Sequence, residues 1–142
     1  RKTSQTDGTG TTSYGYDTVG RLTSRTSPQG SVSYAYDAAG RKTSQTVGSA
    51  TTTYSYDNAG RLLSAVAPNG TTSYAYDAAG RVSVVTLPNG TTQNHAYDST
   101  TGDLLQLWHK NSGGGTLVQY SYGYDNLGRK TSEVQWGGNF SG

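Results

Sequence analysis

Residues 31–41 read SVSYAYDAAGR and contain the pattern that decides the fold, an alternating stretch that runs into the hexapeptide Tyr-Asp-x-x-Gly-Arg. The hexapeptide begins at residues 16, 36, 56 and 76, each time twenty residues after the last. It returns over 97–103, with one inserted residue and Asp103 in place of the arginine, and again over 124–129. Recurrence at a fixed period of this length indicates a repeat array, in which each unit contacts chiefly its neighbours.

The recurring residues are expected to be structural, because an active site does not need a copy in every unit. We predict about six copies of a roughly 20-residue unit over residues 1–142, with an atypical, lengthened repeat at 98–123. Both ends stop inside a unit, so we expect a segment of a longer chain. The motif residues are Tyr16, Asp17, Gly20, Arg21, Tyr36, Asp37, Gly40, Arg41, Tyr56, Asp57, Gly60, Arg61, Tyr76, Asp77, Gly80, Arg81, Tyr97, Asp98, Gly102, Tyr124, Asp125, Gly128 and Arg129.

A glycine also recurs at intervals of ten residues over 20–40 and again over 60–90, which is the length of one short strand and one tight turn. Residues 37–40 read Asp-Ala-Ala-Gly, with Asp at the opening and Gly at the closing position of a type I turn. The alternate turns read Pro-Asn-Gly at 68–70 and 88–90. A type I turn followed by a left-handed glycine is a common hairpin connection.

The segments between turns alternate with the period of a β-strand, so both tyrosines of Tyr34-Ala35-Tyr36 face one way and a small residue faces the other. No stretch has a helical period. We therefore predict an all-β fold of about thirteen antiparallel strands in hairpin repeats. Because twisted open sheets rarely exceed about ten strands, the sheet should form a curled or spiral, solenoid-like shell segment. With 31% hydrophobic residues, a thick globular core is not expected.

Side-chain contacts at the turn can be predicted from the same pattern. If the turn closes as proposed, Tyr36 lies across from Arg41 and Tyr34 across from Thr43, so that Arg41 stacks on a tyrosine of its own hairpin. The carboxylate of Asp37 should accept hydrogen bonds from the amides of the turn and pair with Arg41.

Composition excludes several classes of function. Charged residues make up 14% of the chain and the formal net charge is +2, without the clustered basic face that nucleic-acid binding requires. Cysteine and methionine are both absent, so there is no disulfide framework or thiolate metal site. No apolar run approaches the roughly 20 residues of a membrane-spanning helix. We expect no cofactor, no metal site and no nucleic-acid partner.

The hexapeptide, followed by a strand, a Pro-x-Gly turn and a Thr/Ser/Tyr strand, resembles the YD-repeat or RHS-repeat family over nearly the whole chain. The resemblance implies a long antiparallel sheet wound into a spiral shell. Such shells enclose a toxin domain in bacterial RHS proteins and insecticidal toxin complexes, and form a barrel in teneurins. The copy at Tyr97 departs from the pattern by its insertion and by Asp103, which places arginine stacking there in question. In the toxin-bearing relatives, a terminal core with an Asp-Pro-x-Gly signature follows the repeats and cuts off the cargo. Asp-Pro does not occur in this sequence, so the resemblance implies a segment of wall alone.

Few residues outside the motif are candidates for a site. His95 occupies the position of the first tyrosine of a pair. Its imidazole is therefore better explained as an aromatic replacement for tyrosine than as a ligand or a general base. Trp108 and His109 lie in the long excursion 104–117, whose tip reads Asn-Ser-Gly-Gly-Gly. They are candidate docking residues, although drift in repeat length explains the excursion more simply.

These observations favour a non-enzymatic structural segment, part of a β-sheet shell that encapsulates a toxin or other cargo in a secreted or cell-surface bacterial protein. The expected partners are neighbouring repeats of the parent chain and the enclosed cargo. An extracellular binding or fibre-forming module is the alternative, in which tyrosines bind cell-wall carbohydrate or strand edges drive self-association. An enzyme ranks third.

Overall fold

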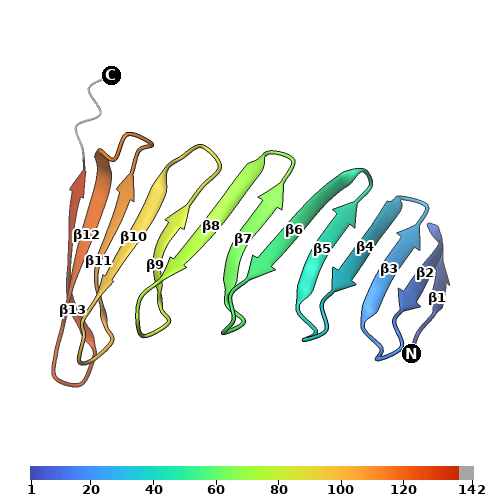
Figure 1. Ribbon diagram of the computed structural model, residues 1–142, viewed down its shortest axis with the longest axis horizontal. Helices are drawn as coiled ribbons and strands as arrows, with labels where there is room; N and C mark the ends of the chain where they lie inside the picture. Colours follow the sequence, from blue (N-terminus) through green and yellow to red (C-terminus); the bar gives the residue numbers. More distant parts are fainter. Residues whose placement is uncertain (138–142) are drawn as a thin grey trace. The chain divides into compact units, whose positions relative to one another are not determined.

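The computed structural model describes residues 1–137 and contains thirteen β-strands (Figure 1). No helix occurs in that part of the chain. Thr, Ser, Tyr and Val, which favour extended structure, dominate the strands. The strands are β1 Ser4–Asp7, β2 Gly10–Tyr16, β3 Leu22–Ser27, β4 Gly30–Tyr36, β5 Lys42–Val47, β6 Ala50–Tyr56, β7 Leu62–Ala67, β8 Gly70–Tyr76, β9 Val82–Thr86, β10 Thr92–Tyr97, β11 Leu104–Lys110, β12 Thr116–Tyr124 and β13 Lys130–Gly137.

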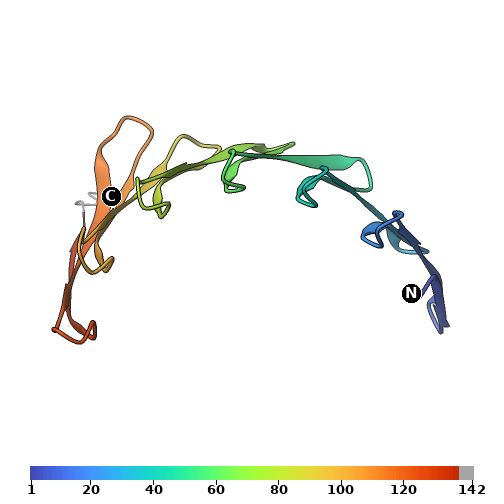
Figure 2. The same cartoon turned by 60° about the horizontal axis from the view of Figure 1, so that its bottom comes forward.

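The chain divides into two compact units, Arg1–Gly70 and Thr71–Gly142. In each unit the strands lie in chain order, each antiparallel to the one before it, as the hairpin pattern predicts. Figure 2 shows that the sheet bends within each unit, which agrees with the prediction of a curled sheet. Antiparallel order places all turns of the Asp-x-x-Gly type at one end of the strands of a unit and the alternate turns at the other (Figure 1).

The Asp turn closes as predicted. The amide of Gly40 donates to the carbonyl oxygen of Asp37 at 3.0 Å, and the amide of Asp37 donates to the carbonyl oxygen of Arg41 at 2.9 Å. Gly40 has a φ of 83°, a left-handed conformation in which a Cβ is unfavourable. The same pair of bonds closes the hairpins that open at Asp17, Asp57 and Asp125.

The alternate turns are of two kinds. Between Ser27 and Gly30, and between Val47 and Ala50, the strands pair directly across a two-residue loop, which is tighter than predicted. The turn at 87–90 instead repeats the Asp-turn pattern, because the amide of Gly90 donates to the carbonyl oxygen of Leu87 at 2.9 Å. Glycine thus marks both turn positions, and the geometry predicted for the alternate turn is found at 87–91 and again at the tip 111–115.

The sheet has no interior. None of the described residues is buried, and alternation is seen only as a difference between half-buried and exposed side chains. In β4, Tyr34 and Tyr36 are half-buried, whereas Ser33 before them and Ala35 between them are exposed. The expected common face of the tyrosine pair and the expected lack of a thick core are both confirmed. Backbone ladders and contacts along the tyrosine face must therefore supply much of the order.

The predicted cross-strand register is wrong by one or two residues. Tyr36 pairs with Lys42 and Tyr34 with Gln45, not with Arg41 and Thr43. The pairing of Asp37 with Arg41 at the turn sets Tyr36 opposite Lys42. A β-bulge between Ala35 and Tyr36 then leaves Thr43 as an extra residue on β5, which shifts the partner of Tyr34 by one more residue. Arg41 belongs to the turn, and its carbonyl oxygen closes the hairpin. Its side chain therefore does not lie across from Tyr36.

Candidate functional site

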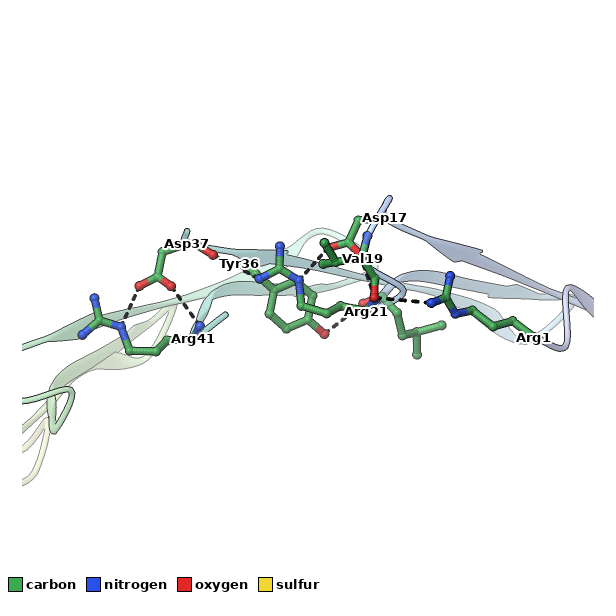
Figure 3. Close-up of polar contacts among 8 residues, drawn as sticks. Arg1, Asp17, Val19, Arg21, Tyr36, Asp37 and Arg41 are labelled. Atoms are coloured by element: carbon green, nitrogen blue, oxygen red, sulfur yellow. Dashed lines mark hydrogen bonds and ion pairs between the residues drawn. The ribbon is translucent and has the colours of Figure 1, made fainter. Parts of the chain in front are cut away.

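The motif aspartate organises the turn that follows it. In the second hairpin, Asp37 Oδ1 accepts a hydrogen bond from the amide of Arg41 at 2.9 Å, and Asp37 Oδ2 accepts one from Arg41 Nε at 2.7 Å (Figure 3). Both carboxylate oxygens are thus bound to the same residue, once through its backbone and once through its side chain. The predicted ion pair within each turn is confirmed at Asp17–Arg21, Asp37–Arg41, Asp57–Arg61, Asp77–Arg81 and Asp125–Arg129.

These contacts stabilise the ionised carboxylate. The side-chain and backbone hydrogen bonds from Arg41 lower the pKa of Asp37 below its ordinary value. At Asp125 the backbone bond from Arg129 is the largest cause, followed by the guanidinium, and the pKa is again lowered. The aspartates are therefore held as anions, in environments that resemble one another from repeat to repeat.

The arginine contacts the next repeat. Arg21 Nη1 donates to the carbonyl oxygen of Asp37 at 3.1 Å, and the Arg21 guanidinium lies 4.8 Å from the centre of the Tyr36 ring. Tyr36 Oη in turn donates to the carbonyl oxygen of Leu22, at 2.9 Å. Figure 3 shows Arg21 beside Tyr36 and bonded to Asp17. Arginine stacking was predicted correctly as an interaction but assigned to the wrong tyrosine, because Arg21, fifteen residues earlier, occupies the face of Tyr36.

We call this set of contacts the repeat clamp: the Asp and Arg of one motif, and the Tyr and Asp of the next. It recurs from Arg41, whose Nη1 lies 3.2 Å from the carbonyl oxygen of Asp57 and whose guanidinium lies 4.9 Å from the Tyr56 ring. It recurs again from Arg81, with distances of 3.2 Å to the carbonyl oxygen of Asp98 and 4.4 Å to the Tyr97 ring. The clamp thus links successive hairpins, whereas the Asp turn closes one hairpin.

The tyrosine hydroxyl bond is a part of the clamp that the sequence pattern did not reveal. It goes to the backbone oxygen of the residue that follows the motif arginine, from Tyr56 to Lys42 and from Tyr97 to Val82. Its acceptor is a main-chain atom, so no side-chain pattern marks it. The nearest signal in the sequence was the almost constant interval between a motif arginine and the next tyrosine, 15 residues from Arg21 to Tyr36 and 16 from Arg81 to Tyr97.

The clamp is incomplete where Asp103 replaces arginine. A guanidinium still lies over the Tyr97 ring, because it comes from Arg81 of the preceding motif. The expectation of disturbed stacking at Tyr97 is therefore wrong. The change appears one repeat later, at Tyr124. Tyr124 Oη still donates to the carbonyl oxygen of Leu104 at 3.0 Å, but no cation lies over its ring among the contacts of the described residues. Asp103 Oδ2 instead accepts a hydrogen bond from Thr101 Oγ1, at 2.6 Å.

A second cation contacts the tyrosine face between clamps. Lys42 Nζ lies 4.8 Å from the centre of the Tyr54 ring and 5.9 Å from that of Tyr34, and it donates to Gln45 Oε1 at 2.9 Å. Lysine at this position therefore spans the first tyrosines of two successive pairs. Such contacts contribute about 0.5 to 1 kcal/mol each at exposed rings.

His95 takes the place of a tyrosine, as predicted. Its ring is stacked with Tyr97, with centroids 6.3 Å apart and planes 11° apart, and its Nδ1 is buried without a hydrogen-bond partner. Burial lowers the pKa of His95 below its ordinary value. Trp108 and His109 lie half-buried on β11, and His109 contacts Tyr120 edge to face at 6.4 Å. A docking role for these two residues stays a prediction.

The lengthened hairpin reuses the turn chemistry of the motif. The tip at 111–115 closes through bonds between Asn111 and Gly115, and Asn111 Oδ1 accepts the amides of Gly113 and Gly115 at 3.0 and 2.8 Å. The side-chain oxygen of Asn111 thus accepts the turn amides, as the aspartate carboxylate does in the motif turns. Over residues 1–137, no group of three or more His, Cys, Asp or Glu side chains is arranged to hold a metal ion. The same residues include no helix long and apolar enough to cross a membrane.

Comparison with solved structures shows the same fold. The crystal structure of TcdB2-TccC3-TEV matches with a TM-score of 0.78 at 21% identity, over 94% of this chain and 8% of that chain. The crystal structure of TcdB2-TccC3 matches with a TM-score of 0.77 at 20% identity, over 92% of this chain and 8% of that chain. A structure of a Photorhabdus luminescens Tc holotoxin pore matches with a TM-score of 0.59 at 16% identity, over 89% of this chain and 9% of that chain. The chain therefore spans less than a tenth of each of these proteins.

No curated protein matches this chain in sequence. The family model described as RHS Repeat does match, over residues 3–32, 16–52, 46–72 and 56–92, which together cover more than half of the chain. On this ground the chain belongs to the RHS repeat family.

Proposed function

We propose that this chain is a non-enzymatic wall segment of a β-sheet shell that encloses a toxin or other cargo in a secreted or cell-surface protein. The observation that carries the proposal is the repeat clamp. Within each unit it joins successive hairpins through charged and aromatic contacts such as those of Arg21 with Tyr36 and Asp37 and those of Arg81 with Tyr97 and Asp98. A sheet built in this way can be extended by adding repeats, because each new unit meets the same set of partners.

Two further observations support a wall. The described residues have no buried core, so the sheet is one layer thick and both faces are open to whatever lies beside them. The fold covers nearly all of this chain but only 8% of the TcdB2-TccC3 chain, which suits a segment of a longer wall. The motif aspartates are each bound within their own turn, which supports the proposal that the chain carries no catalytic centre.

Cryo-electron microscopy of the natural gene product that contains these residues tests the proposal. A hollow particle with these repeats in its wall, and with cargo that resists added protease until the wall is opened, is the expected result. A solid particle, or an extended fibre that lengthens with protein concentration, would refute encapsulation. The fibre would favour the alternative of self-association through strand edges.

A further inference from the structure

The replacement of a motif arginine by Asp103 leaves a hollow in the second unit. The hollow has a volume of about 460 Å³, and its lining includes Asp98, Asp103, Tyr124, Asp125 and Gly128. These residues belong to two successive motifs, which are the ones that a clamp arginine at position 103 would join. The volume is within the range of roughly 300 to 1,000 Å³ that is common for small-ligand sites.

The equivalent positions elsewhere in the same chain are filled by a guanidinium. Arg21 is hydrogen-bonded to the carbonyl oxygen of Asp37, stacked on Tyr36 and close to Gly40, where an added Cβ would lie 3.5 Å from its Nη1. Arg81 has the same relation to Gly102, again at 3.5 Å. The tyrosine ring, the aspartate carbonyl and the turn glycine together form the site that receives the cation.

At the hollow the three receiving groups are present. Among the contacts of residues 1–137, no guanidinium stacks on the Tyr124 ring, and the neighbouring Lys130 lies over Tyr122 instead. A Cβ added at Gly128 would have nothing within 4 Å, and the carbonyl oxygen of Asp125 accepts only the amide of Gly128 among the hydrogen bonds of the described residues. Tyr124 is half-buried and oriented as in the other repeats, because its hydroxyl is bonded to Leu104. The receiving site is therefore preformed.

Arg1 contacts the first receiving site in a similar way. Its side chain extends over Tyr16 at 6.0 Å and donates to the carbonyl oxygen of Val19, in the turn that follows Tyr16, at 3.3 Å. The charge at the hollow favours the same ligand. Asp98, Asp103 and Asp125 all line it, and although Asp125 is paired with Arg129, Asp98 and Asp103 form no ion pair among the described residues.

We propose that the hollow between the motifs at 97–103 and 124–129 binds an arginine side chain supplied in trans by another polypeptide segment. The guanidinium would donate to the carbonyl oxygen of Asp125 and to the Asp103 carboxylate while it stacks on the Tyr124 ring. This inference does not depend on encapsulation, because it concerns the completion of a clamp and applies equally to a fibre or a binding module.

Titration of the isotope-labelled chain with N-acetyl-arginine amide, followed by NMR, tests the proposal. We expect saturable shifts of the amides of Tyr124, Asp125 and Gly128 with a dissociation constant in the millimolar range. The neutral isostere N-acetyl-citrulline amide should cause less than a tenth of the shift. The filled clamp at Tyr36 and Asp37 is the internal control and should not respond. No saturable shift at Tyr124, or an equal shift with citrulline, would overturn the proposal.

Two variants sharpen the test. Asp103→Arg supplies the guanidinium from within the chain, so it should abolish binding of the probe and raise the melting temperature. Asp103→Asn removes one charge with little change of shape and should weaken binding several-fold. Full binding by both variants would overturn the proposal. If Asp103→Arg does not fold, Arg41→Ala provides the converse test: methylguanidinium should then bind at Tyr56 and Asp57, and a failure to bind would contradict the idea that the receiving groups suffice.

Discussion

The glycine that closes each Asp turn is required by its backbone conformation. Gly40 has a φ of 83°, whereas no non-glycine residue among those described has a positive φ. The nearest side-chain atom to a Cβ added at Gly40 would be Arg21 Nη1, at 3.5 Å, so the position has room for a methyl group. A substitution there should therefore be unfavourable because of backbone strain rather than because of a collision.

Gly40→Val should lower the free energy of unfolding by about 1 to 2 kcal/mol, because a β-branched residue is unfavourable in the left-handed region. Ala39→Val, one residue earlier in the same exposed turn, should change it by less than about 0.5 kcal/mol. Urea denaturation of the two variants and the parent measures both effects. Equal midpoints for the two variants would contradict the turn assignment.

The clamp arginine makes contacts both within its own turn and with the next repeat. Arg41→Gln removes the bond to Asp37 Oδ2, the bond to the carbonyl oxygen of Asp57 and the stacking on Tyr56. We expect a loss of about 1 to 2 kcal/mol, since an exposed ion pair contributes about 0.2 to 1 kcal/mol and a cation over a ring about 0.5 to 1. Arg25→Gln, at an exposed arginine on β3, is the matched control and should be nearly neutral. A loss of the same size at Arg25 would show that charge alone matters.

At the scale of elements, the features that could be predicted from the sequence are those that depend on neighbouring residues alone. The strands and the closing bonds of the Asp turns follow from alternation and from turn residues, and both are present as expected. The register could not be predicted, because the bulge before Tyr36 leaves no separate mark in the sequence. The clamp depends on that register, so its arginine was assigned to the wrong hairpin.

The same reasoning explains the Asp103 position. Loss of arginine at that motif was visible in the sequence, but its effect falls on Tyr124, which follows an elongated hairpin. Only a structure that shows which tyrosine each arginine contacts could place it. The alternate turns were also harder to predict, because Pro-x-Gly-type sequences close either as two-residue loops or as the five-residue turn of 87–91.

The stability of the folded chain should depend on pH through His95 on β10. Burial lowers the pKa of His95, so the unfolded chain binds a proton more readily than the folded chain does. The stabilising effect of the neutral ring is complete above the unfolded pKa of about 6.5 and is lost progressively as the pH falls below that value. His95→Tyr restores the ring that the other repeats carry and should reduce the difference in stability between pH 7.5 and pH 5. Urea midpoints at the two pH values measure this, and an unchanged difference would exclude His95 as the cause.

At the scale of the whole molecule, the clamp contacts recur once in each twenty-residue repeat, because each one joins an arginine to the tyrosine and aspartate of the next motif. Deletion of residues 22–41 joins Arg21 to Lys42, so that Arg21 can take the place of Arg41 at Tyr56 and Asp57. We expect this variant to keep a β-sheet spectrum and a cooperative melting transition. Deletion of residues 32–41 removes one strand instead of two and should place the next Tyr-Asp turn at the opposite end of the strands from Arg21.

Circular dichroism and thermal melting of the two deletions distinguish a twenty-residue from a ten-residue unit. The ten-residue deletion should melt at a lower temperature and with less cooperativity, because it breaks a clamp as well as removing contacts. If both deletions melt alike, pairing of backbone strands alone determines the array and the clamp contributes little. That result would also weaken the support that the clamp gives to a wall function.

The central claim is that the motif arginine stacks on the tyrosine of the following repeat rather than on that of its own hairpin, while it also pairs with the aspartate of its own turn. A double-mutant cycle tests it directly, with Arg41→Gln combined in turn with Tyr56→Leu and with Tyr36→Leu. The observed geometry predicts a coupling free energy of about 0.5 to 1 kcal/mol between Arg41 and Tyr56 and additivity within about 0.3 kcal/mol between Arg41 and Tyr36. Coupling of Arg41 to Tyr36 with none to Tyr56 would contradict the account.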